Sequence, residues 1–166
     1  MDRSGPSAAD SASEVSAALT PRAEEMSADI YRLIVREIPQ LRNDQRVLAL
    51  LEASVTENVG TVLHILQHGI DLEKVHAPAA AEEYARRLAQ YGVPLAALLR
   101  AYRIGSARFE DWCLQELGRR SDDAAVVSAA GLRIAGILGR GEPPASHHAR
   151  PPARGAGPAG LPLAGR

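Results

Sequence analysis

Two arginines carry the most distinctive chemistry in this sequence. Arg100 and Arg103 lie three residues apart, so on a helix they project from neighbouring points of one face. Neither has an aspartate or glutamate three or four residues away that would neutralise it. A guanidinium presents a planar fork of N–H donors that fits carboxylate and phosphate groups. Arg100 and Arg103 are therefore the first candidates for binding an anionic ligand or an acidic partner surface.

Three further residues are weaker candidates for binding a ligand or a partner. Arg86 and Arg87 each follow a glutamate by four residues, and such pairs stabilise a solvated helix face. Asn58 falls in the middle of a predicted helix, beside its apolar stripe. A buried amide there would need a hydrogen-bond partner on another helix or on a ligand. Arg108 has Asp111 three residues on, which predicts a local ion pair.

Chemistry that needs a metal or a nucleophile is not indicated. His64 and His68 are four residues apart and could chelate a metal, but they fall on a polar helix face and lack the metalloprotease glutamate. We expect both to be solvated. Cys113 lies near an apolar helix face beside Trp112, which predicts a core thiol. We find no nucleophile–base pair, phosphate loop or carboxylate pair at meaningful spacing, and expect no enzyme activity, metal or cofactor.

Composition limits the partners and the compartment. The 166 residues carry a formal net charge of -1, which disfavours binding to nucleic acid or to an anionic membrane through bulk charge. The aromatic residues are one Trp, four Tyr and one Phe, too few for a base-stacking surface. The single cysteine fits a reducing compartment. We see no signal peptide and no membrane span, and therefore expect a cytoplasmic protein.

The elements that position these residues are predicted to be helices throughout. We predict an all-α fold, a single bundle of four to five helices. Thr20 with Pro21 and Ser121 are expected to start the first and last helices, and Gly92 and Pro94 to separate the third from the fourth. The expected helices cover residues 20–38, 43 or 44 to 69, 78–91, 94–119 and 122–138.

Apolar residues spaced three and four apart predict which face of each helix is buried. The second helix has the clearest stripe, formed by Leu48, Leu51, Val55, Val59, Val62 and Leu66. The third is expected to bury Tyr84, Leu88 and Tyr91. The fourth is expected to bury Leu95, Leu98, Tyr102, Phe109, Trp112 or Cys113, and Leu117.

Composition also divides the chain into three parts. Residues 1–19 are rich in Ser and Ala and are expected to be a disordered leader. Residues 20–138 are expected to form one helical domain. Residues 139–166, rich in Pro, Gly, Ala and Arg, are expected to be a disordered tail, because they cannot offset their ordering entropy by burial.

Several motifs between about Ile30 and Leu117 match a known family in order and spacing. They are Ile38-Pro39-Gln40-Leu41, Ser54-Val55-Thr56-Glu57-Asn58-Val59, Ala77-Pro78, Glu83-Tyr84-Ala85-Arg86-Arg87, Gly92-Val93-Pro94 and Leu98-Leu99-Arg100-Ala101-Tyr102-Arg103. This region resembles the N-terminal sensor module of actinobacterial PucR/CdaR-like regulators. That module is related to the N-terminal domain of RsbRD-type co-antagonists of the RsbT kinase.

The resemblance implies a non-enzymatic signal-sensing and dimerisation module of a transcriptional regulator. It implies a homodimer or a regulator partner, and a possible small-molecule effector. The chain departs from the family pattern after residue 138, where the family continues towards a C-terminal helix-turn-helix. We therefore expect a regulator truncated before that effector domain, with no direct DNA binding by this chain.

Other functions predict different features. A protein–protein interaction scaffold of the RsbR stress-signalling type would have a filled core and an exposed apolar patch, whereas a sensor would have an enclosed pocket. A cofactor-holding globin-like bundle is disfavoured because His64 and His68 face solvent. The unit around Gly92 could be a DNA-reading helix-turn-helix, but Leu88 crowds the turn and the next helix opens with apolar residues.

Overall fold

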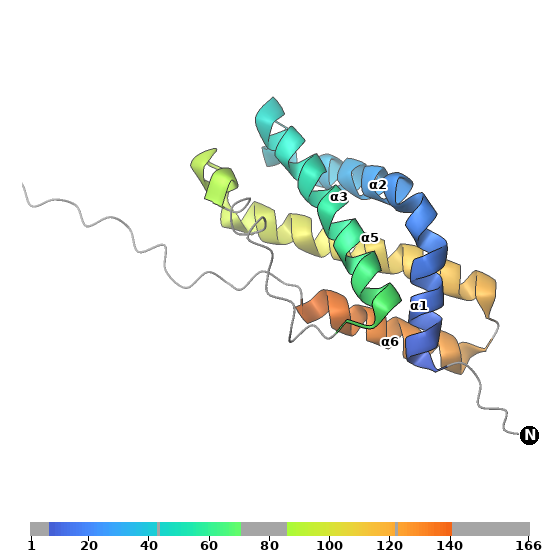
Figure 1. Cartoon of the computed structure of the whole chain (residues 1–166). Helices are drawn as coiled ribbons and strands as arrows, with labels where there is room; N and C mark the ends of the chain where they lie inside the picture. The colour runs from blue at the N-terminus through green and yellow to red at the C-terminus, as the bar shows by residue number, and fades with distance from the viewer. Residues whose placement is uncertain (1–6, 43, 71–85, 122, 141–166) are drawn as a thin grey trace, which may run out of the picture.

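The computed structural model describes residues 7–42, 44–70, 86–121 and 123–140, and in these ranges it is helical without strands (Figure 1). The predicted all-α bundle is confirmed. The elements are α1 (Ala8–Leu19), the 3₁₀ turn η1 (Thr20–Arg22), α2 (Ala23–Glu37), the 3₁₀ turn η2 (Pro39–Leu41), α3 (Gln45–His68), α5 (Leu95–Arg120) and α6 (Ala124–Arg140).

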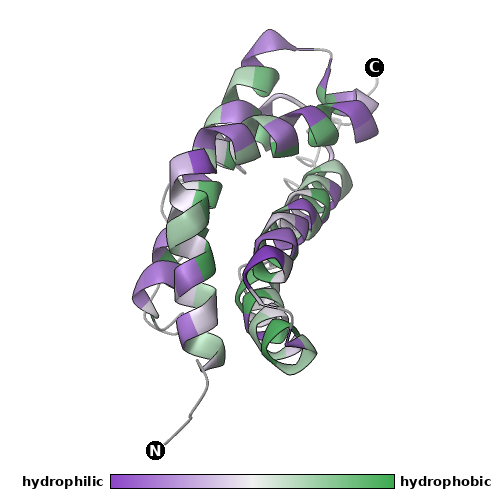
Figure 2. Ribbon diagram, turned by 90° about the vertical axis from the view of Figure 1, so that its right-hand side faces the viewer, coloured by the Kyte–Doolittle hydropathy of each residue, from purple (hydrophilic) through white to green (hydrophobic). Residues whose placement is uncertain are grey.

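The helices pack in pairs around one core. α1 and α2 form a bent arm that lies along α3, while α5 packs against α2 and runs back to α6, which also contacts α1 (Figure 1). Hydrophobic residues gather on the helix sides turned towards one another, and hydrophilic residues face outward (Figure 2). The bundle therefore holds the start of α5 against the end of α2.

The predicted disordered leader is wrong for the described residues 7–19, since residues 8–19 form α1 and Ser7 caps it. Ser7 and Asp10 make a reciprocal capping box, with each backbone N–H donating to the other's side chain, at 3.1 and 3.2 Å. Val15 and Leu19 are fully buried. The Ser16 hydroxyl donates to the Leu63 carbonyl at 2.5 Å and fixes α1 on α3. Composition does not predict this helix, because its apolar residues are few, although they lie on one face.

The start of the next helix also differs from the prediction. Thr20 does not cap α2; its hydroxyl donates back to the Ser16 carbonyl at 2.8 Å, and the chain continues through η1 without a side-chain cap. The end of α2 agrees with the prediction from Pro39, because the helix stops at Glu37. Arg42 completes this end by donating to the backbone carbonyls of Val35 and Arg36.

The second predicted helix is closely reproduced by α3. Asp44 caps it by accepting from the Arg46 N–H at 2.7 Å, and Gly69 ends it with a φ of 60°. Leu51, Val55 and Val59 are buried as predicted. Leu66 is buried as well, whereas Leu48 and Val62 are half-buried. The stripe is wider than predicted because Val47, Leu63 and Ile65 are also buried.

The buried face of α5 is only partly the predicted one. Leu95 is 51% exposed and Leu98 and Tyr102 are half-buried. In the described helical residues 86–90 that precede α5, Leu88 is buried. Tyr91, which follows them, is 42% exposed, and Tyr84 lies outside the described residues. The described positions facing the bundle recur every four residues: Ala97, Ala101, Gly105, Phe109, Cys113 and Leu117.

Small residues explain this difference. An added Cβ on Gly105 would lie 3.5 Å from both the Ile30 Cγ2 and the Ile34 Cδ1 atoms. Ala97 and Ala101 continue the same row. The first half of α5 therefore approaches its neighbours closely through alanine and glycine, while larger leucines lie to the side. A prediction that counts only large apolar residues does not identify such a buried face.

The last helix begins and ends two residues later than predicted. Its first turn is held by Asp123, whose carboxylate accepts from the Ala125 N–H at 2.9 Å, and Ser121 instead accepts from the Asp123 N–H. The helix buries Ala130, Ile134 and Leu138. Residues 139 and 140, assigned to the tail by composition, are helical, and residues 141–166 lie outside the described part of the chain.

Candidate functional site

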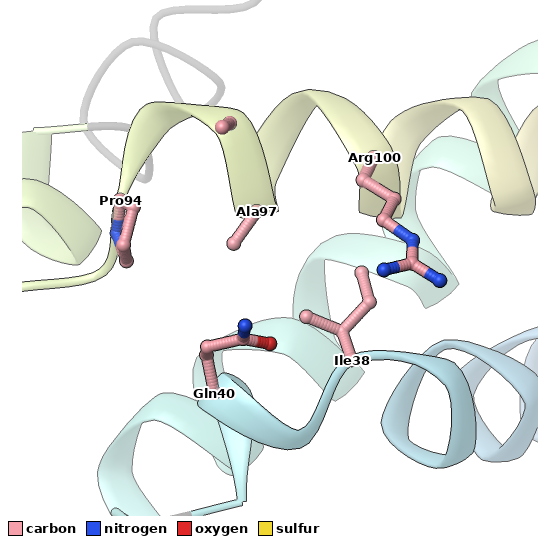
Figure 3. Close-up of a pocket in the computed structure, with 6 residues that line it drawn as sticks. Ile38, Gln40, Pro94, Ala97 and Arg100 are labelled. Atoms are coloured by element: carbon pink, nitrogen blue, oxygen red, sulfur yellow. The ribbon is translucent and has the colours of Figure 1, made fainter.

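A small open pocket lies between the end of α2 and the start of α5. Its volume is about 190 Å³. Ile38 and Gln40 line it from one side, and the first two turns of α5 line it from the other with Pro94, Ala96, Ala97 and Arg100 (Figure 3). The Arg100 side chain extends from α5 towards Ile38, and the Gln40 amide points into the same space. Two segments far apart in sequence thus place polar groups around an apolar wall.

The pocket lining is electropositive. Arg100 is the only charged residue among the six that line it. Arg108, Arg119 and Arg120 each lie within 4 Å of a carboxylate, whereas Arg100 has no such neighbour among the described residues. Pro94 precedes the first residue of α5 and provides no side-chain cap, so the positive end of the helix dipole remains at this edge. The arrangement fits an anionic group.

The other candidate arginines do not line this pocket. Arg86, Arg87 and Arg103 are exposed, and each interacts with another residue. Arg103 follows Arg100 on α5, but the structure places only Arg100 beside Ile38 and Gln40. Both arginines are exposed, and of the two only Arg100 lines the pocket.

Asn58 and the two histidines lie on the outer surface of α3. Asn58 is exposed and its amide donates to the Ser54 hydroxyl at 3.4 Å, so it needs no hydrogen-bond partner on another helix. His64 and His68 are exposed as expected, with ring centroids 4.4 Å apart. No group of three or more His, Cys, Asp or Glu residues in the described ranges is arranged to hold a metal ion.

Cys113 is a buried thiol, as the sequence predicts. Its side chain is fully enclosed in the core between α5 and its neighbours. Burial, with a smaller contribution from the Glu110 charge, raises the pKa of the Cys113 thiol to about 12. A thiol with so high a pKa is a poor nucleophile at neutral pH.

A polar cluster that the sequence does not reveal joins α2 to α5. The Asp29 carboxylate accepts from the Arg108 guanidinium at 2.7 Å and from the Trp112 indole N–H at 2.9 Å. The Arg22 guanidinium carbon lies 4.5 Å from the centre of the Trp112 ring. The predicted partner of Arg108, Asp111, is a secondary one at 3.6 Å. Only the i, i+4 spacing of Arg108 and Trp112 hints at this cluster in the sequence.

Hydrogen bonding sets the charge state of Asp29. Burial by itself would raise the pKa of this carboxyl, but the hydrogen bonds from Arg108 and Trp112 outweigh it and hold the pKa below its ordinary value. The pKa of the Arg108 guanidinium is raised, mainly because it donates a hydrogen bond to Asp29. The cluster is satisfied internally, which indicates a structural clamp between two helices rather than a binding site.

Comparison with known families now identifies the domain. A family model described as the RsbT co-antagonist protein rsbRD N-terminal domain matches residues 24–150, which is more than half of the chain. The chain belongs to the RsbRD_N family. The match covers both walls of the pocket and, in the Asp29 cluster, Asp29, Arg108 and Trp112 but not Arg22. No curated protein and no solved structure matches this RsbRD_N chain.

Family membership confirms part of the resemblance seen in the sequence. The RsbRD N-terminal relationship is shown, and it makes this a signalling-related helical domain. The match begins just inside α2, so α1 precedes the region that the family model describes. No helix in the described part of this RsbRD_N domain is long and apolar enough to cross a membrane.

Proposed function

We propose that this RsbRD_N chain is a non-enzymatic signal-sensing and dimerisation module of a cytoplasmic transcriptional regulator of the PucR/CdaR-like type. Membership of the family supports the signalling role, and the last described helix, α6, supports the way in which the signal is passed on. In this mechanism a ligand or partner biases the packing at the start of α5, and α6 passes that bias to the rest of the regulator.

The observation that carries the proposal is the outer face of α6. One side of this helix packs on α1 and α5. The other side exposes Leu132 at 76%, the most exposed large hydrophobic residue of the described chain. The side chains around it are small, since Ala125, Ser128 and Ala129 are exposed on the same helix. A leucine beside small residues is self-complementary across a two-fold axis.

Charge also favours a second copy of this chain as the occupant of that face. Between Ala124 and Gly139 the only charged residue is Arg133, so two copies meet without a carboxylate to desolvate and with little repulsion. A face of this composition would gain by burying Leu132 in a partner. We therefore place the dimer contact on α6.

The test is the oligomeric state of the full chain measured by light scattering during gel filtration. The wild type is expected to be a dimer, and Leu132→Arg a monomer. Arginine keeps a high helix propensity but buries two charges in a symmetric contact, which should weaken association about tenfold or more.

A matched control is Leu95→Arg, the same change at another exposed leucine on a different helix. It should leave the dimer intact. A monomeric wild type, or equal effects of the two substitutions, would remove α6 from this role. Unchanged helicity by circular dichroism confirms that each variant is folded.

The second candidate function, an interaction scaffold of the RsbR-type stress-signalling class, is favoured by a specific observation. The pocket beside Arg100 is small and open, while exposed apolar side chains occur at Tyr91, Leu95 and Leu132. A scaffold of this class would bind an RsbT-type kinase directly. Stable, saturable binding of such a kinase by the isolated chain, lost in Leu132→Arg, would favour the scaffold over the transcriptional regulator.

A further inference from the structure

The pocket between η2 and α5 has the features of a site for a small organic acid. Its walls come from two elements that other contacts already hold together, since α2 and α5 are clamped by Asp29, Arg108 and Trp112. These contacts hold together the two helices that carry the pocket walls. Figure 3 shows the open space between the Gln40 amide and the start of α5.

The polar groups of the pocket select for a negative charge. Arg100 supplies guanidinium N–H donors, and Gln40 adds an amide that can donate from the opposite wall (Figure 3). None of the six lining residues is acidic. A guanidinium without a carboxylate partner among the described residues can donate two parallel hydrogen bonds to the carboxylate of a ligand. Neutral ligands would leave this capacity unused.

The apolar groups of the pocket limit the rest of the ligand. Ile38, Pro94 and Ala97 offer aliphatic surface beside the charged end. The volume of about 190 Å³ holds more than a single water but falls below the roughly 300–1,000 Å³ of pockets that bury drug-sized molecules. An acid with a short aliphatic chain or one ring fits these limits, whereas a nucleotide does not.

We propose that this pocket binds a small organic monocarboxylate, with its carboxylate on Arg100 and Gln40 and its apolar body against Ile38, Pro94 and Ala97. Such a ligand would bridge η2 and α5 and fix their spacing. The proposal rests on the proposed sensing function only for its biological meaning, because binding itself is measured directly.

The experiment is a titration of the full chain with benzoate, followed by heteronuclear NMR and repeated with benzamide and inorganic phosphate. Benzamide has the same ring without the charge, and phosphate has charge without an apolar body. We expect saturable shifts with benzoate at residues around Ile38 and Ala97, and much weaker effects from the other two probes. Equal binding of benzamide, tighter binding of phosphate, or no saturable benzoate shift would overturn the proposal.

Two arginine variants locate the charge that matters. Arg100→Gln should weaken benzoate binding about tenfold, the cost of losing one charge-assisted contact. Arg103→Gln removes an equal charge one turn away, outside the pocket, and should change affinity by less than about twofold because exposed charges are screened. Equal losses in both would reduce the effect to bulk charge and overturn the site. Arg100→Lys, which keeps the charge but not the fork, should fall between the wild type and Arg100→Gln.

Failure of this proposal is distinguishable from failure of the dimer model. Leu132→Arg lies far along the chain on α6 and should bind benzoate like the wild type whether or not it dimerises. A Leu132→Arg variant that loses benzoate binding while keeping its helicity would contradict a site confined to η2 and α5.

Discussion

Asp29 shows how a single side chain can join two helices that the sequence leaves unconnected. It and Arg108 are 79 residues apart, and the Arg108 guanidinium donates to it at 2.7 Å. Spacing rules within one helix could pair Arg108 only with Asp111, which the structure shows as the longer contact. Contacts of this kind depend on how helices cross, which local residue spacing does not encode.

The lowered pKa of Asp29 makes its contribution to stability depend on pH. A carboxyl whose pKa is lower in the folded than in the unfolded chain stabilises the fold above its unfolded pKa, near 3.9. That stabilisation is lost as the pH falls through the lower, folded value. Asp29→Asn should therefore lower the free energy of unfolding by about 1–3 kcal/mol at pH 7, and by less below about pH 3. Urea unfolding at both pH values measures it.

Asp111→Asn provides the control for that measurement, since Asp111 is more exposed and lies farther from Arg108. Asp111→Asn should lower the free energy of unfolding at pH 7 by less than about 1 kcal/mol. Equal costs for the two variants would show that the clamp depends on general charge around Arg108, not on the hydrogen bonds at Asp29.

Cys113 should report on unfolding of the whole core. Its thiol is buried and its pKa is raised to about 12, so little thiolate forms in the folded chain at neutral pH. We expect a disulfide reagent to modify native protein only as fast as the chain opens, and to react at once in denaturant. Rapid modification of native protein would contradict the placement of this thiol.

Helix limits were more predictable than helix faces. The end of α2 before Pro39, and both ends of α3 at Asp44 and Gly69, follow from local backbone chemistry and agree with the structure. The face of α5 does not follow, because Ala97 and Ala101 are buried there although they contribute little hydrophobicity. How closely two helices approach depends on the side chains of both, so the sequence of one helix alone does not predict it.

The small-residue row on α5 gives a sharp test at the level of one helix pair. Ala101→Leu should destabilise the fold by about 1–3 kcal/mol, because it overpacks a buried site. Gly105→Ala should be neutral or stabilising by up to about 1 kcal/mol, because the added Cβ meets Ile30 and Ile34 at an ordinary 3.5 Å and alanine favours helix. Urea midpoints compare the two.

The reverse order, a costly Gly105→Ala and a tolerated Ala101→Leu, would mean that α5 lies farther from its neighbours than described. Ala107→Leu is a suitable control, since Ala107 is exposed on the same helix and should tolerate the larger side chain.

For the whole molecule, the ends of the chain should differ in their effect on stability. Removing residues 1–19 takes away Val15 and Leu19, whose burial is worth about 3–6 kcal/mol together, and uncovers α3 and α6. We expect Tm to fall by more than about 10 °C. Removing residues 141–166, which lack apolar spacing in the sequence, should leave Tm nearly unchanged. Differential scanning calorimetry of both truncations makes the comparison.

The sequence predicts one residue of the candidate site but not the residues opposite it. Arg100 stands out in the sequence because it lacks a local acid, but Gln40 and Ile38 are ordinary residues whose relevance appears only when η2 meets α5. Arg103 stands out for the same reason and lies elsewhere. Composition likewise missed α1, since a sparse apolar face counts only when another helix covers it.

The row of core positions on α5 has a consequence for how any signal travels. Four residues advance a helix by about 400°, so each step from Ala97 to Leu117 turns the buried side by about 40°, and the row winds about 200° around the axis. Along this winding face α5 packs against three helices, α2, α1 and α6. A rotation of α5 about its axis would therefore disturb its contacts with all three. A ligand at Arg100 that turned α5 would also change the packing of α5 on α6.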